Sequence, residues 1–586
     1  MKQNQYLFLL FALIVLTGCG GTQKKLTEYV NPFLGTATLW EPEDLGYTRK
    51  IKSRTWGAET YPGATLPNAM VQLSPVTQFR SGAGYQYEDT VIYGFSHTAK
   101  GHWNLLHVPM LPVVGTIAPG NYCSGFSHEK ESAHPGYYQV YLERYKVNAE
   151  LTSTLRCAYH KYTFGKGDDK SLLVDIRRSN NDVRDWKIEK VDDNTFTGYQ
   201  DGDGKIYFYA KTNYKIGQVE MVKDDKHEVA VLRFIDSKGV EPLEVKAGFS
   251  FVSIENAQMN LKAEMLNKSF AQVAEEADAA WEALLSKIQV AGGTEREKRL
   301  FYSTFFHAFK WPALRSDVNH EYTDVRGEVV NNGFHYYTDP SFWDDYRNKL
   351  VLIGMISPDV TIIDKGEKRD GYMPTFFHGD HASTFISGSW LRGLHDFDLE
   401  RAYKLILKNA TVPGKGGRRY LDEYMERGWI AEKDTVNVPT WDEYKGAVTK
   451  TQEYAYDDYA VALVAKELGD EANYKLMMER SNNYKTLFDP STGFWRGKID
   501  DGSWIQDFDP YYPYYQYMYR EANAWNALFF APHDPEGMIK LYPSKEAVEA
   551  KLDSLFSEPW RGYEAHNLTG FIGNYCHGNQ PGHSIP

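Results

Sequence analysis

The period of the hydrophobic pattern changes once along this chain, near residue 260, and that change constrains the fold more than any other feature. Between about residues 26 and 253, short apolar or alternating runs such as 205–210 and 229–234 are separated by turn residues. Regular strands with frequent turns are typical of a β-sandwich. From residue 268 onward, apolar residues instead recur every three or four positions, which is the period of an amphipathic helix.

The second half of the chain is predicted to be helical. The first helix, over 268–290, has its apolar residues at Phe270, Val273, Ala277, Trp281, Leu284 and Ile288. Further helices are expected at 295–311, 381–410, 451–468, 470–487 and 519–530, with long aromatic and Gly/Pro-rich loops between them. The pattern predicts a multidomain α+β protein with a β-sandwich at 26–260, a linker helix at 261–294 and a helical barrel at 295–586. Functional residues are expected in the loops at one rim of the barrel.

The N-terminus predicts export. Lys2 precedes an apolar run at residues 6–16, which is too short to span a membrane. The run ends in Leu-Thr-Gly-Cys at 16–19, which resembles a bacterial lipobox and predicts cleavage before Cys19 and lipidation of that residue. We therefore expect a lipid-anchored protein on the periplasmic or cell-surface face of the outer membrane. The alternative is an ordinary secretory signal, residues 1–19, with an incidental cysteine.

Composition narrows the choice of partner. The chain has 586 residues with 65 Lys+Arg and 78 Asp+Glu, a net charge of −13. This acidic balance argues against nucleic acid and anionic membrane surfaces, which select basic patches. Aromatic residues make up 15%, including 42 tyrosines and 14 tryptophans. Flat aromatic faces suit sugar rings, so the composition favours carbohydrate; a tyrosine-rich core is the alternative.

Three cysteines remain besides Cys19, at positions 123, 157 and 576. A disulfide between Cys123 and Cys157 is possible in an oxidising compartment, but it is not our preferred interpretation. The cysteine spacing is not typical of a metal site.

One candidate sugar site is the segment 343–347. Trp343 stands beside Asp344 and Arg347, and Asp and Arg side chains can hold neighbouring sugar hydroxyls by charge-assisted hydrogen bonds while an indole stacks on the ring. The alternative is a packed tryptophan with an ion pair at the surface.

Candidate acids lie further along the chain. Glu453 and Asp457 are spaced i, i+4, which places both on one helix face; that face is either solvated or part of a site. Glu521 is set among aromatic residues, which could raise its pKa as a general acid requires. The alternative for Glu521 is a stabilising position at a helix N-terminus.

Three further segments are candidates for metal or phosphate binding. The oxygen-rich loop at 577–581 could bind calcium, although a plain turn is the simpler interpretation. His378, Asp380 and His381 could ligate a transition metal, but a loop-to-helix junction is favoured. The segment 414–419 lacks the ending of a phosphate loop and is interpreted as a flexible basic loop.

Taken in order, these segments resemble glycoside hydrolase family 92, the exported calcium-dependent α-mannosidases of bacteria. The resemblance rests on the residues 29–36, 61–75, 92–97, 343–347, 452–459, 494–497, 521–534 and 577–581. It implies an N-terminal β-sandwich, a helical linker and an (α/α)6 barrel. It also implies inverting hydrolysis of α-mannosides, with an acid and a base about 6.5–9.5 Å apart.

The resemblance also implies residue roles. Glu521 matches the general acid, Trp343, Asp344, Arg347 and His577 match the mannose pocket, and Asn579 and Gln580 match the calcium end of the site. Some positions depart from the family pattern. Ala522 follows the acid where the family usually has Gly, Gln580 replaces a Glu, which should weaken calcium binding, and Gly578 leaves the linkage open.

The chain stops at Pro586, whereas family members run further and carry a Gly-Asn-Asp-Asp segment with the proposed base. From this difference we expect a C-terminally truncated barrel. Two functions follow: an exo-α-mannosidase acting on mannose-rich glycans with calcium, or a catalytically degenerate glycan-binding lipoprotein that lacks its base. A hydrolase of the same fold acting on another sugar is a third possibility.

Overall fold

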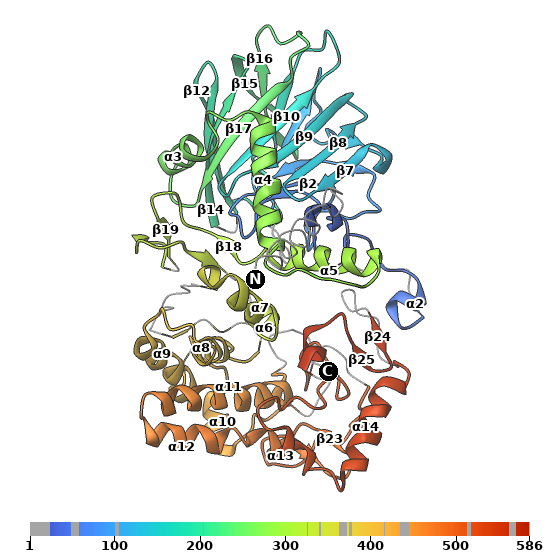
Figure 1. Ribbon diagram of the computed structural model, residues 1–586, viewed down its shortest axis with the longest axis vertical. Coiled ribbons are helices and arrows are strands. Elements are labelled where there is room, and N and C mark those ends of the chain that lie inside the picture. The colour runs from blue at the N-terminus through green and yellow to red at the C-terminus, as the bar shows by residue number, and fades with distance from the viewer. Residues whose placement is uncertain are drawn as a thin grey trace, which may run out of the picture.

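The computed structural model describes residues 24–48, 58–99, 105–202, 204–324, 326–338, 342–361, 372–373, 375, 378–414, 416–433, 445–511, 517–561 and 570–584. They form a β-sheet domain and a helical domain at opposite ends of the molecule (Figure 1). This arrangement confirms the predicted fold class. The predicted signal and the lipidation site Cys19 lie outside the described residues.

The N-terminal domain consists mainly of two antiparallel sheets. The seven-stranded sheet contains, in spatial order, β1 (Ala64–Thr65), β2 (Gln72–Val76), β4 (Gly94–Ser96), β5 (Met110–Val113), β11 (Ser171–Val174), β16 (Glu228–Phe234) and β15 (Ile216–Lys223). The eight-stranded sheet contains β12 (Asp185–Asp192), β13 (Thr195–Gly202), β14 (Gly204–Thr212), β17 (Leu243–Ser250), β10 (Cys157–Thr163), β9 (Val147–Ser153), β8 (Tyr137–Leu142) and β7 (Glu131–His134). Smaller elements are η1 (Leu26–Tyr29), α2 (Pro42–Leu45), η2 (His128–Lys130) and the pair β3 (Val91–Ile92) and β6 (Ser124–Gly125).

The inner faces of the two sheets share one hydrophobic core. Along β8 every second residue is buried, because successive side chains of a strand point to opposite faces. Tyr138 and Phe208 from the eight-stranded sheet join Leu172 and Val231 from the seven-stranded sheet in this core. The alternation seen in the sequence is therefore the alternation between core and solvent.

Buried histidines in this domain predict acid sensitivity. His97 and His160 lie 2.9 Å apart, nitrogen to nitrogen, and burial lowers the pKa of His97 to about 3. Because the unfolded chain binds a proton near pH 6.5, the stabilisation is complete above that pH and is lost as the pH falls toward 3. We expect His97 alone to contribute a slope of about 1.4 kcal/mol per pH unit in this range.

Urea titrations at pH 7 and pH 5 measure this slope. His97→Gln should reduce it, and the same change at the exposed His227 should leave it as in the wild type. Equal slopes in all three proteins would contradict the assignment.

Three helices connect the domains. They are α3 (Ile254–Glu264), α4 (Phe270–Leu285) and α5 (Glu295–Ala308). Phe270, Val273, Ala277, Trp281 and Leu284 are buried along α4, which confirms the helical spacing seen in the sequence. The predicted linker at 261–294 contains the end of α3 and the whole of α4 rather than one helix, because Ser269 caps a new helix with its side chain and Gln272 closes the capping box. Trp281 fixes α4 to the β domain by donating its indole N–H to the Thr65 carbonyl at 2.6 Å.

After α5 the chain forms a short connecting region and then the helical domain. Its elements are β18 (Ala313–Leu314), β19 (Glu321–Thr323), β20 (Val329–Asn331), β21 (Tyr337–Thr338), α6 (Phe342–Asp345), α7 (Lys349–Ile356), η3 (Pro358–Thr361), α8 (Ala382–Leu391), α9 (Leu399–Thr411), α10 (Leu421–Arg427), α11 (Ala447–Glu467), α12 (Glu471–Arg480), η5 (Asn483–Leu487), β22 (Phe488–Asp489), β23 (Phe494–Trp495), α13 (Pro535–Ile539), α14 (Lys545–Ser557), β24 (Phe571–Ile572), β25 (Tyr575–Cys576) and η6 (Gln580–Ser584). In the part of the chain that is described, no helix combines the length and apolarity needed to cross a membrane.

Three helix predictions need correction. The segment 470–487 contains α12, which ends at Arg480, and then the separate 3-10 helix η5. The segment 381–410 is divided into α8 and α9, because Asp398 caps a second helix at its N-terminus. The segment 519–530 is not a helix: Glu521 has a φ of 50°, in the left-handed region. Asn523 and Asn526 accept hydrogen bonds from each other's backbone N–H, which competes with helical pairing.

The described cysteines Cys123, Cys157 and Cys576 are all free thiols. The disulfide considered between Cys123 and Cys157 is therefore not formed.

Candidate functional site

A small pocket lies in the helical domain where α6, α11 and the turns after residue 519 meet. Its cavity volume is only about 20 Å³, and it is lined by Trp343, Arg347, Thr449, Gln452, Glu453, Arg520, Ala522, Asn526, Ala527 and Phe530. Two of the predicted sugar-binding residues, Trp343 and Arg347, belong to this lining. Asp344, the third residue of that segment, is half-buried beside them and is outside the lining.

Trp343 is fixed by a carboxylate rather than by a surface contact. Its indole N–H donates to Glu453 Oε1 at 2.9 Å, and Arg347 Nη1 donates to the Trp343 carbonyl at 2.5 Å. Arg347 Nη2 lies 3.8 Å from the same Glu453 oxygen, and both side chains are about 95% buried. The surface alternative for this segment is therefore wrong.

Glu453 and Asp457 share one face of α11, as their spacing predicted, and that face is buried. His381 lies against both: its Nδ1 is 3.0 Å from Asp457 Oδ1, and its Nε2 is 3.8 Å from Glu453 Oε2. Burial by itself lowers the pKa of His381, but the two carboxylates outweigh it and raise the pKa to about 9. A buried cation therefore separates two buried carboxylates, and the solvated alternative for this face is wrong.

A second group of buried charges includes Asp458, which follows Asp457 on α11. Arg418 donates to Asp380 Oδ2 at 3.1 Å and to Asp458 Oδ1 at 2.6 Å, and Arg480 lies 2.9 Å from Asp458 Oδ2. All of these groups are buried. The interpretation of 414–419 as a flexible basic loop is wrong for Arg418, which is 1% exposed and connects α8 to α11.

The residues 378–381 form the loop-to-helix junction favoured from the sequence, since α8 begins at Ala382. The Asp380 carboxylate already accepts hydrogen bonds from Arg418 and from the Asn409 amide, which donates to Asp380 Oδ1 at 3.0 Å. Within the described ranges, no group of three His, Cys, Asp or Glu side chains could hold a metal ion.

Glu521 is buried at the edge of the pocket, since its chain neighbours Arg520 and Ala522 both line it. The Asn579 amide donates to the Glu521 carbonyl at 2.7 Å, so the structure joins two predicted site residues from distant parts of the chain. Burial first, and then the charge of Arg347, lower the pKa of His583. His577 is exposed on that segment, beside the Tyr575 hydroxyl at 3.1 Å.

The predicted calcium ligands do not make a calcium site by themselves. Asn579 Oδ1 accepts the backbone N–H of Gln580 at 3.1 Å, and its amide nitrogen is held by Glu521. Asn579 and Gln580 offer neutral oxygens, whereas calcium takes six to eight oxygen ligands and its affinity rises with their charge. The side chains described at 577–580 therefore do not fit the ion without further ligands.

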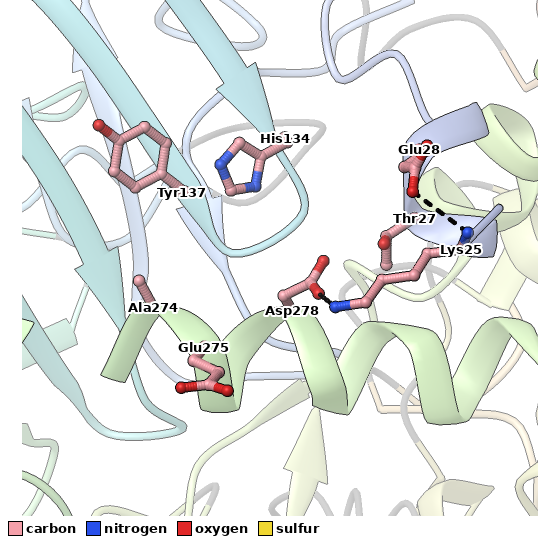
Figure 2. A pocket seen from close by; sticks show the side chains of 8 residues that line it. All are labelled: Lys25, Thr27, Glu28, His134, Tyr137, Ala274, Glu275 and Asp278. Atoms are coloured by element: carbon pink, nitrogen blue, oxygen red, sulfur yellow. Dashed lines mark hydrogen bonds and ion pairs between the residues drawn. The ribbon is translucent and has the colours of Figure 1, made fainter. Parts of the chain in front are cut away.

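A larger, more open hollow of about 540 Å³ lies elsewhere, between η1, the β7–β8 hairpin and α4 (Figure 2). Lys25 closes one side by pairing with Asp278 at 2.7 Å, and His134 stacks on Tyr137 at the other side with ring centroids 4.7 Å apart. None of the predicted site residues lines this hollow.

The sequence agrees with known proteins along almost its whole length. Residues 256–586 match the Glycosyl hydrolase family 92 catalytic domain, and residues 29–263 match the Glycosyl hydrolase family 92 N-terminal domain. A protein of Arthroderma benhamiae described as an uncharacterized secreted glycosidase is 24% identical over 635 residues, covering 92% of this chain and 78% of the relative.

Solved structures agree with these matches. The family GH92 alpha-mannosidase BT3965 from Bacteroides thetaiotaomicron is 28% identical, with a TM-score of 0.84, covering 95% of this chain and 78% of that protein. The same enzyme is known in complex with mannoimidazole. The inverting mannosidase BT2199 from the same organism is 23% identical, with a TM-score of 0.77 and coverages of 92% and 75%, and supports the fold. The chain belongs to glycosyl hydrolase family 92.

Proposed function

We propose that this protein is an exported α-mannosidase that releases terminal α-linked mannose from mannose-rich glycans with inversion. The observation that carries the proposal is the small pocket itself, whose wall combines a buried indole, a carboxylate and a guanidinium. The side chains of this wall have the chemistry that a sugar needs, because a ring packs on apolar surface while its hydroxyls meet charged partners. Since the cavity is only about 20 Å³, the lining side chains must move apart to admit the sugar. The 28% identical mannosidase and its mannoimidazole complex support mannose as that sugar.

In this proposal Glu521 is the general acid that protonates the leaving oxygen. Trp343, Asp344, Arg347 and His577 hold the terminal mannose. An inverting mechanism also requires a base about 6.5–9.5 Å from the acid, so that water can enter between the two groups. Lipidation at Cys19 would anchor the enzyme to the membrane, on the periplasmic or cell-surface face. The description of a relative as secreted supports export.

The proposed calcium dependence can be tested by changing Gln580. If the ion binds near Asn579, replacing the neutral Gln580 with glutamate adds a charged ligand and should tighten calcium binding by about tenfold or more. Calorimetric titration of calcium into wild type and Gln580→Glu measures the change, with Gln506→Glu as a control remote in sequence. Identical calcium affinity in wild type and Gln580→Glu would remove this residue from any calcium site.

Mannose release tests the proposal. The purified protein is incubated with α-mannobioses of each linkage and with mannose-rich glycans, and the free sugar is quantified by anion-exchange chromatography. Release of mannose from at least one substrate is expected. Glycan binding without release from any α-mannoside would instead support a degenerate glycan-binding protein, for which the neutral Gln580 is the motivating observation.

A further inference from the structure

A buried carboxylate of the pocket wall has an acceptor oxygen without a donor among the residues that the structure describes. Glu453 lines the pocket, and its side chain is 6% exposed. Its Oε1 accepts the Trp343 indole N–H, but its buried Oε2 accepts no hydrogen bond from the residues that the structure describes. A buried acceptor without a donor is costly, and protein interiors rarely contain one unless a ligand or water satisfies it.

We propose that Glu453 is a substrate-binding residue whose free carboxylate oxygen accepts a hydrogen bond from a hydroxyl of the terminal sugar, and that His381 is the positioning residue that holds this carboxylate. This inference rests on the proposed function. The sequence resemblance assigned neither residue a role. A sugar hydroxyl is the matching partner, since it donates one hydrogen and a carboxylate can only accept.

The surroundings of Glu453 fix both its place and its charge. Trp343 holds Oε1 at 2.9 Å, and the guanidinium of Arg347 is 3.8 Å from that atom. His381 Nε2 is 3.8 Å from Oε2, too far to satisfy it by a hydrogen bond but close enough to attract its charge. The carboxylate is thus held from two sides with one oxygen left for the pocket.

His381 is itself held in one orientation. Its Nδ1 contacts Asp457, and the ring of Tyr346 stacks on it with centroids 3.9 Å apart at 15°. Asp457 also accepts the backbone N–H of Asp380 at 2.6 Å, which ties the start of α8 to α11. Removing the charge of His381 therefore releases Glu453 without touching the pocket lining.

Monodeoxy substrates test the contact. Wild type, Glu453→Gln and the control Glu467→Gln, which alters an exposed residue at the end of the same helix, are assayed on an aryl α-mannoside and on its 2-, 3-, 4- and 6-deoxy analogues. Loss of a hydrogen bond to a charged group corresponds to about 10–100-fold in kcat/KM. We expect the kcat/KM of wild type and of Glu467→Gln to be lower by this factor on one of the four analogues than on the parent substrate.

The kcat/KM of Glu453→Gln on the parent substrate should be lower than that of wild type by a similar factor. Its kcat/KM should fall little further on that analogue. Losses that multiply for every analogue would overturn the contact. His381→Gln should reduce discrimination between the parent and that analogue, whereas a purely structural role would lower both rates equally and overturn the positioning role. Thermal unfolding of each variant verifies folding.

The test remains decisive if the protein releases no mannose. In that case the proposed function fails, and calorimetric titrations of mannose and the monodeoxy mannoses replace the kinetics. Weaker binding of one deoxy sugar to wild type, with no such difference in Glu453→Gln, would support the contact. Equal binding of all the sugars, or none, would overturn it, including the case in which Oε2 meets only a buried water.

Discussion

Replacing Glu521 with glutamine is expected to lower kcat on an α-mannobiose by about 10²–10⁴-fold, because the amide cannot protonate the leaving oxygen. Glu521 is buried between Arg520 and Ala522, which both line the pocket, and the proposed function assigns its carboxyl to the leaving oxygen. Glutamine keeps the shape of the side chain and its neighbours. The measurement is the initial rate of mannose release at saturating substrate.

The leaving group separates acid catalysis from a general loss of structure. The dinitrophenolate of a dinitrophenyl α-mannoside leaves without being protonated. Glu521→Gln should therefore retain much more activity on this substrate than on the disaccharide. Glu536→Gln, at an exposed position on α13, is the matched control and should behave as wild type. Equal losses on both substrates, or no loss on the disaccharide, would contradict the role of Glu521.

Replacing Arg418 with methionine is expected to destabilise the helical domain by about 3–5 kcal/mol, because it leaves the buried Asp380 carboxylate without its cation and Asp458 with Arg480 alone. Arg418 contacts Asp380 at the start of α8 and Asp458 on α11, and no part of this contact is exposed. Methionine fills similar space without charge. Urea unfolding followed by tryptophan fluorescence measures the loss.

The control for this change is an arginine whose ion pair is exposed. Arg427 pairs with Asp500 at 3.0 Å, and the aspartate side chain is 82% exposed. Exposed pairs contribute little because water and salt screen them, so Arg427→Met should unfold at the same urea concentration as wild type. An Arg418→Met protein that also unfolds with wild type would show that the buried charges contribute no net stability.

Much of the fold follows from local patterns in the sequence. The alternating burial of β8 and the three-to-four spacing along α4 come directly from the residues, because the period of apolar residues sets which face is buried. The boundary between the two domains follows from the change between these periods. The break between α8 and α9 was missed, although Asp398 is a capping residue that signals it.

The site was less predictable than the fold. Trp343 and Arg347 were recognisable because an aromatic ring, an acid and a guanidinium lie within five residues of each other. The role of Arg418 could not be predicted from the sequence, since its partners Asp380 and Asp458 are 38 and 40 residues away along the chain. The turn at Glu521 was read as a helix because its apolar spacing fits one, while the side chains of Asn523 and Asn526 favour the turn.

Time-resolved proton NMR of α-mannobiose cleavage shows whether this protein is an inverting α-mannosidase. The anomeric signals identify which form of mannose appears first, before mutarotation mixes the two. We expect β-mannose as the initial product, because in an inverting enzyme water attacks from the face opposite the leaving oxygen. Initial release of α-mannose, or no release of mannose from any linkage, would contradict it.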